Sequence, residues 1–87
     1  MAPAPSASAR STVDQAFGRV LRQLRTSQGL SQEALGLASG NGRTFVSQLE
    51  RGERGASLKT LFRLAAELDT PPSEIVGLVE ELLGLRK

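Results

Sequence analysis

The triplet Gly40-Asn41-Gly42 constrains this chain more than any other feature, because it separates two short segments of helical periodicity. Two glycines around an asparagine favour a turn with positive φ angles and interrupt a helix. The pattern therefore predicts helices over about residues 31–39 and 43–51, joined by a turn of only three residues. So short a connection forces the helices to cross sharply, and Gly36 would leave room for a close approach. The side chains expected to point inward are Leu35, Ala38, Val46 and Leu49.

Three further helices are predicted on either side of this pair. The first begins at about Thr12 and stops at Gly29, and the fourth is capped by Ser57. Pro71-Pro72 opens the fifth, which runs to about Leu83, because proline suits a first helical turn. The inward residues expected are Val13, Phe17, Val20, Leu21 and Leu24 in the first helix, and Leu58, Leu61, Phe62, Ala65 and Leu68 in the fourth.

The chain is expected to form one all-α domain. No segment alternates apolar and polar residues strictly, so strands are not expected. Residues 1–11 are mostly alanine, proline and serine, and this composition predicts a disordered N-terminal tail. Residues 12–87 are then the folded domain, which is an ordinary size for a small one.

The residue types present argue against an enzyme or a metal protein. The chain has no cysteine and no histidine, so disulfides, the usual zinc ligands and the usual general base are excluded. We therefore expect no catalytic residue, no metal site and no cofactor. The chain also leaves no room for a ligand-sensing domain, so no small-molecule ligand is expected. The sequence has no apolar run of the roughly 18 residues that span a bilayer, and its N-terminus lacks the apolar core of a signal peptide. A soluble, cytoplasmic protein without a membrane partner is the expectation.

Charge is distributed unevenly along the chain. Between Arg19 and Arg63 there are eight arginines and lysines against three glutamates, whereas residues 64–87 hold five acidic residues against two basic ones. A basic middle beside an acidic end favours one surface that attracts a polyanion and another that serves a different purpose.

The two helices around the triplet resemble the helix-turn-helix of the lambda-repressor/Cro-like (XRE) family of bacterial and phage regulators. The residues that carry the resemblance are Gly29-Leu30-Ser31-Gln32-Glu33-Ala34-Leu35 and Arg43-Thr44-Phe45-Val46-Ser47-Gln48-Leu49-Glu50-Arg51-Gly52. It extends from about Leu21 to Val76 and implies a compact five-helix, lambda-repressor-like DNA-binding domain with the helix-turn-helix at its second and third helices. The chain departs from the family at Ser39 and Asn41, which are usually apolar, and at Ala56, which is usually proline. We expect Asn41 to compensate by capping the third helix.

The resemblance places the third helix in the major groove of double-stranded DNA. The residues then expected to contact bases are Arg43, Thr44, Ser47 and Gln48, with Arg43 suited to guanine and Gln48 to adenine. Phe45 would either touch a thymine methyl or sugar, or pack against the neighbouring helix. The expected phosphate contacts are Ser31, Gln32, Arg51, Arg54 and Lys59, and those of Ser31 and Gln32 gain support from the partial positive charge of a helix N-terminus. For Arg54 and Lys59 the equal alternative is that each is an ordinary solvated charge that contacts no phosphate.

Two further sets of residues are assigned structural roles. The resemblance implies that Arg25 and Glu50 form an ion pair. This pair would hold the first helix against the third, which is the recognition helix expected in the major groove. In the fifth helix the apolar residues cover about 180°, more than a helix packed on one core needs, so residues 72–85 are expected to form a dimerisation helix. The residues expected in that interface are Ile75, Leu78, Val79, Leu82 and Leu83; the alternative is that the helix lies deeper in its own core.

These expectations favour a transcription regulator, most simply a repressor or autoregulator that binds an inverted-repeat operator as a homodimer. It would repress by occupying a promoter or activate by touching the polymerase. Its own regulation would come through concentration, proteolysis or a partner protein. The rival hypothesis is an interaction protein, such as the antitoxin that neutralises a toxin, whose DNA binding is autoregulatory. Neighbouring genes discriminate between these hypotheses. A small, basic, toxic reading frame beside this gene would indicate an antitoxin, a restriction or methyltransferase gene would indicate a restriction controller, and phage genes would indicate a prophage repressor.

Overall fold

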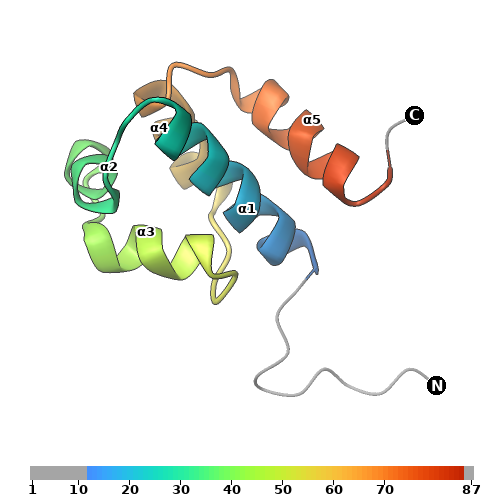
Figure 1. Ribbon diagram of the computed structural model, residues 1–87, viewed down its shortest axis with the longest axis horizontal. Helices are drawn as coiled ribbons and strands as arrows, with labels where there is room; N and C mark the ends of the chain where they lie inside the picture. The colour runs from blue at the N-terminus through green and yellow to red at the C-terminus, as the bar shows by residue number, and fades with distance from the viewer. Residues whose placement is uncertain (1–11, 86–87) are drawn as a thin grey trace.

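The computed structural model describes residues 12–85, and these form five helices (Figure 1). In chain order they are α1 (Thr12–Ser27), α2 (Gln32–Ser39), α3 (Arg43–Glu50), α4 (Leu58–Glu67) and α5 (Pro72–Leu82). No strand occurs within this range, so the predicted all-α class is confirmed. The predicted tail, residues 1–11, lies outside the described residues.

Helix α1 is the central element of the fold. It packs against α3 on one side and α5 on the other, while α2 packs against α3 and α4 (Figure 1). The helices enclose two adjoining clusters of buried apolar side chains. One joins α1 to α2, α3 and α4 through Leu21, Leu35, Val46, Leu49, Leu64 and Leu68, and the other joins α1 to α4 and α5 through Ala16, Val20, Ala65, Ile75 and Val79.

Four residues predicted to point inward are exposed instead. On α4, Leu58 and Phe62 are 71% and 56% exposed, because the buried side of this helix is centred near Leu64, which was not among the predicted inward residues. Val13 is exposed because it lies a turn before the first buried residue of α1, Ala16. On α2 the buried position one turn after Leu35 belongs to Ser39, and Ala38 faces outward. The buried Ser39 hydroxyl donates a hydrogen bond to the carbonyl of Gly36 at 3.3 Å.

None of the helices within residues 12–85 combines the length and apolar character needed to cross a membrane.

Candidate nucleic-acid interface

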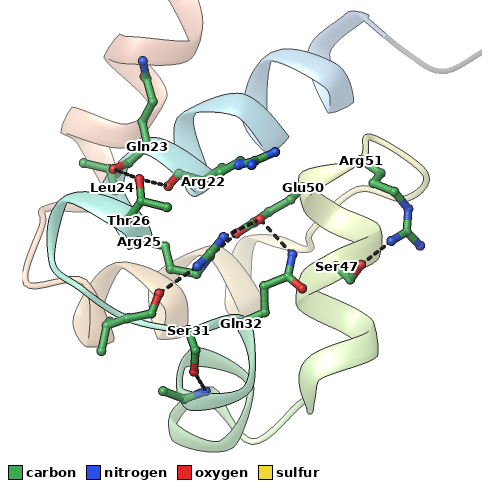
Figure 2. A network of polar contacts seen from close by, with 12 residues as sticks. Arg22, Gln23, Leu24, Arg25, Thr26, Ser31, Gln32, Ser47, Glu50 and Arg51 are labelled. Atoms are coloured by element: carbon green, nitrogen blue, oxygen red, sulfur yellow. Dashed lines mark hydrogen bonds and ion pairs between the residues drawn. The ribbon is translucent and has the colours of Figure 1, made fainter.

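The corner between α2 and α3 is built from a serine cap and two glycines. Ser31 caps α2, with its Oγ accepting a hydrogen bond from the backbone N–H of Ala34 at 2.9 Å (Figure 2). At the other end Gly40 and Gly42 have φ angles of 81° and 85°, a region that glycine enters without steric penalty. The N–H groups of Asn41 and Gly42 both donate to the carbonyl of Gly36 at 3.0 Å, which closes the turn. The predicted sharp corner is therefore confirmed.

Gly36 is the residue that lets the two helices touch. A Cβ atom at this position would lie 2.7 Å from the backbone nitrogen of Arg43 and nearer still to the carbonyl of Gly42. Real Cβ atoms do not approach backbone atoms so closely, so only glycine fits here. The close approach predicted at Gly36 is thus present.

Asn41 does not cap α3, which corrects the sequence-based expectation. Its Nδ2 donates to the carbonyl of Ser39 at 3.1 Å, so the side chain closes the end of α2. Gly42 occupies the N-cap position of α3, and no side chain of the described residues caps that helix there.

A buried ion pair ties α1 to the end of α3. The Nε and Nη2 atoms of Arg25 donate to the two carboxylate oxygens of Glu50 at 2.5 and 3.0 Å, and its Nη1 donates to the carbonyl of Leu30 at 2.7 Å (Figure 2). The two side chains are 11% and 4% exposed. The hydrogen bond to Glu50 raises the pKa of Arg25 above its usual range despite the opposing effect of burial, so the guanidinium stays charged.

Gln32, at the start of α2, is part of the same network. Its Nε2 donates to Oε1 of Glu50 at 3.0 Å, and the side chain is half-buried. Gln32 therefore belongs to the network with Arg25 and Glu50 that holds α1, α2 and α3 together. Its expected phosphate contact stays a prediction. Ser31 is exposed beside it, at the tip of α2.

Gly18 allows α1 to meet the end of α3, and it was not among the residues predicted to matter. A Cβ atom on this residue would lie 2.7 Å from the carbonyl oxygen of Glu50 and closer still to that of Leu49. The available signal was the glycine itself, since a glycine within an otherwise regular amphipathic helix is unfavourable by about 1 kcal/mol and needs a packing reason.

The polar residues predicted on α3 share one side of that helix. At 100° per residue they cover an arc opposite the buried Val46 and Leu49. Arg43 and Thr44, in the first turn, are exposed, while Ser47 and Gln48 are half-buried. The residues of this outward arc are Arg43, Thr44, Ser47, Gln48 and Arg51.

Arg51 is held by its neighbours. Its Nε and Nη2 donate to the carboxylate of Glu53 at 2.8 and 3.0 Å. Its Nη1 donates to the hydroxyl of Ser47, as Figure 2 shows. The hydrogen bond to Glu53 raises the pKa of Arg51 above its usual range. Glu53 was not among the predicted site residues, although its position two residues after Arg51 was a usable signal.

Arg54 also turns toward α3. Its Nη1 donates to Oε1 of Gln48 at 3.1 Å, and its guanidinium carbon lies 4.8 Å from the centre of the Phe45 ring. Phe45 packs against the first core cluster, which is the structural alternative raised for it, and it supports Arg54 at the same time. Lys59, on the first turn of α4, is exposed.

The five predicted interface residues of α5 do not form one surface. Ile75 is fully buried, and Ile75 and Val79 belong to the protomer's own core, which corrects their assignment to a dimer interface. Leu78 and Leu83 are half-buried against the same cluster. Leu82 is 47% exposed, and two further exposed apolar residues of this C-terminal segment are Val76 and Leu85.

The structure is similar to known regulators. It matches the restriction-modification controller protein C.AhdI from Aeromonas hydrophila with a TM-score of 0.72 and 45% sequence identity, over 75% of this chain and 98% of that one. It matches the clp gene regulator ClgR from Corynebacterium glutamicum with a TM-score of 0.80 and 25% identity, over 84% of this chain and 78% of that one. In sequence, the chain is 34% identical to the control protein C.BamHI of Bacillus amyloliquefaciens over 61 residues, which are 69% of this chain and 75% of that protein.

The family assignment agrees with these similarities. Residues 21–75, which contain the whole α2–α3 corner, match the helix-turn-helix family. This range agrees with the extent of the resemblance noted in the sequence. The chain therefore belongs to the helix-turn-helix family, with a corner of the lambda-repressor/Cro-like (XRE) type.

Proposed function

We propose that this protein is a sequence-specific, double-stranded DNA-binding transcription regulator of the restriction-controller type, acting as a homodimer. The observation that carries the proposal is the outward arc of α3, whose polar side chains project from a helix that the Gly36 contact and the Arg25–Glu50 pair hold rigidly. A rigid, protruding helix with such a face suits the major groove.

The roles of individual residues follow from their positions. Arg43, Thr44, Ser47 and Gln48 would face base edges, with Arg43 suited to the O6 and N7 acceptors of guanine. Ser31, Arg51 and Lys59, which are exposed around that helix, would contact phosphates and fix the register without reading sequence.

The exposed apolar residues of the C-terminal segment support a dimer. Val76, Leu82 and Leu85 offer apolar surface that a second copy of the chain would cover. In a two-fold dimer the two recognition helices enter the same side of the duplex about 34 Å apart, so the operator would be an inverted repeat with half-sites about one helical turn apart.

The controller assignment rests on the relatives. C.AhdI is a restriction-modification controller at 45% identity, and C.BamHI is a control protein at 34% identity. We therefore propose that this chain controls genes of a restriction-modification system, and we expect a restriction or methyltransferase gene beside its own.

Selection of bound sites from a random DNA pool tests the function directly. We expect the recovered sites to share an inverted repeat and sedimentation of the purified protein to show a dimer. Gln48→Ala should erase base preference at one position in each half-site, whereas Arg63→Ala, which removes an exposed charge from α4, should leave the motif unchanged. A pool that shows no common motif after selection would refute sequence-specific binding.

Glu53 is expected to weaken DNA binding by competing with phosphate for Arg51. The Glu53 carboxylate already neutralises Arg51. A DNA phosphate that takes the place of this carboxylate therefore causes little net release of counterions from the DNA. Glu53→Gln should therefore tighten binding at low salt by up to about fivefold and steepen the slope of log affinity against log salt by about 0.9. Fluorescence anisotropy at several salt concentrations measures both, with Glu67→Gln as the control for a charge removed elsewhere. Unchanged slope and affinity in Glu53→Gln would mean that Arg51 does not meet a phosphate.

A further inference from the structure

The chain reverses direction at the end of α3, and the residues that follow come back alongside the same helix. Gly52 has a φ angle of 73°, its N–H donates to the carbonyl of Leu49 at 3.0 Å, and the N–H of Glu53 donates to the carbonyl of Gln48 at 2.9 Å. This pair of hydrogen bonds is the Schellman motif, which ends a helix with a left-handed residue. The backbone of the turn is thus fixed, and it sets where the next residue, Arg54, begins.

The guanidinium of Arg54 makes one contact through its flat face and another through an N–H group at its edge. The guanidinium lies over the Phe45 ring, a favourable cation–π arrangement, and its Nη1 donates to Oε1 of Gln48 at 3.1 Å. Phe45 and Gln48 are three residues apart on α3, so they are neighbours on the helix surface. Phe45 packs in turn against the core, so the platform under Arg54 is itself anchored.

We infer that Arg54 is a positioning residue that sets which base Gln48 reads, directing it to the acceptor-rich edge of guanine and away from adenine. This inference rests on the proposed function, because it concerns how the outward arc meets a base pair. It revises two sequence-based expectations, the adenine contact of Gln48 and the phosphate contact of Arg54.

The reason lies in the hydrogen-bonding capacity of an amide. A glutamine reads adenine by donating to N7 with its Nε2 while accepting from the N6 amino group with its Oε1. Here one acceptor site of Oε1 is already taken by Arg54, and the adjacent positive charge disfavours a second donor from the base. The two N–H donors of Nε2 do not conflict with Arg54. Guanine presents two acceptors, N7 and O6, in the major groove, so it matches this donor-only arrangement.

The test compares the purified full chain on four duplexes that differ only at the base pair that Gln48 reads. That pair is identified as the one where Gln48→Ala loses discrimination. Wild-type protein should prefer guanine there, and Arg54→Ala should shift the ratio of guanine to adenine affinity toward adenine by roughly tenfold. Phe45→Leu, which removes the ring under the guanidinium, should shift the ratio in the same direction but less. Lys59→Ala, which removes a cation that does not touch Gln48, should lower affinity for all four duplexes equally.

The double variant Gln48→Ala/Arg54→Ala separates positioning from direct reading. If Arg54 acts through Gln48, the double variant has the same base profile as Gln48→Ala alone. An equal loss on all four duplexes in Arg54→Ala would overturn the inference while leaving the regulator function standing. So would sites selected by Arg54→Ala from a random pool that differ from the wild-type sites at another base pair. If wild-type protein bound all sequences alike, the proposed function would fail and this inference with it.

Discussion

Replacing Glu50 by alanine is expected to destabilise the protein by about 3–5 kcal/mol, because it leaves a buried arginine without its partner. Both side chains of the Arg25–Glu50 pair are almost fully removed from water, and Arg25 keeps only its bond to the carbonyl of Leu30. Gln32 loses its acceptor at the same time. Since a small domain is stable by only about 5–15 kcal/mol, the loss is a large part of the total.

Thermal unfolding by circular dichroism measures this effect, and a fall of more than about 10 °C is expected for a domain of this size. DNA binding should weaken in parallel and return at temperatures where the variant is folded. Glu50→Gln, which keeps one amide oxygen as an acceptor, should be affected less, and the exposed Glu67→Ala should change stability by no more than about 0.5 kcal/mol. An unchanged melting temperature with lost binding would show that Glu50 acts at the DNA and not through the fold.

The stability that Arg25 contributes through its pair with Glu50 is expected not to change with pH near neutrality. The pKa of Arg25 is raised in the folded protein, so its stabilising effect is complete below the pKa of an unfolded arginine and is lost only as the pH rises beyond the folded value. That window is strongly alkaline. The chain has no histidine that would add a charge change near pH 7.

The sequence predicted the corner and the helices well because their signals are local. Serines at helix starts, glycines in the turn and apolar residues at helical spacing act within a few residues of themselves. The errors occurred where the direction of a helix face depends on its neighbours. Leu58 and Phe62 have the correct spacing for the inner face of α4, but the packing of α4 against α1, α2 and α5 centres that face on Leu64.

The candidate site was predictable in its residues but less so in their partners. The outward arc of α3 follows from helix phase, and the Arg25–Glu50 pair followed from a family resemblance. No local rule selects Gln48 as the partner of Arg54, because that contact depends on how the Gly52 turn returns the chain. The contact of Gln32 with Glu50 was not predictable from local rules either, because it joins residues 18 apart in the sequence. The phosphate contact expected of Gln32 stays a prediction.

Replacing Gly36 by alanine is expected to give the second large effect. It should destabilise the fold, although alanine is a better helix former than glycine. An isolated helix would gain about 1 kcal/mol from this change. In the fold, the new methyl group would meet the backbone of Gly42 and Arg43, which cannot move aside as a flexible side chain can. Overpacking of this kind costs roughly 1–3 kcal/mol or more, and α3 would have to move away from α2.

We therefore expect Gly36→Ala to lower the free energy of unfolding by about 2 kcal/mol and to weaken operator binding even where the protein remains folded, because the outward arc is then displaced. Gly40→Ala is the matched control in the same turn. Its Cβ would have no neighbour nearer than Arg63 Nη1 at 3.9 Å, so it carries only the penalty of a positive φ, roughly 1–2 kcal/mol, without pushing the helices apart. The folded Gly40→Ala protein should bind its operator with nearly normal affinity. If Gly36→Ala were more stable than the wild-type protein and bound DNA equally well, the two helices would not be in contact at this corner, and a rigidly presented recognition helix could no longer explain the function.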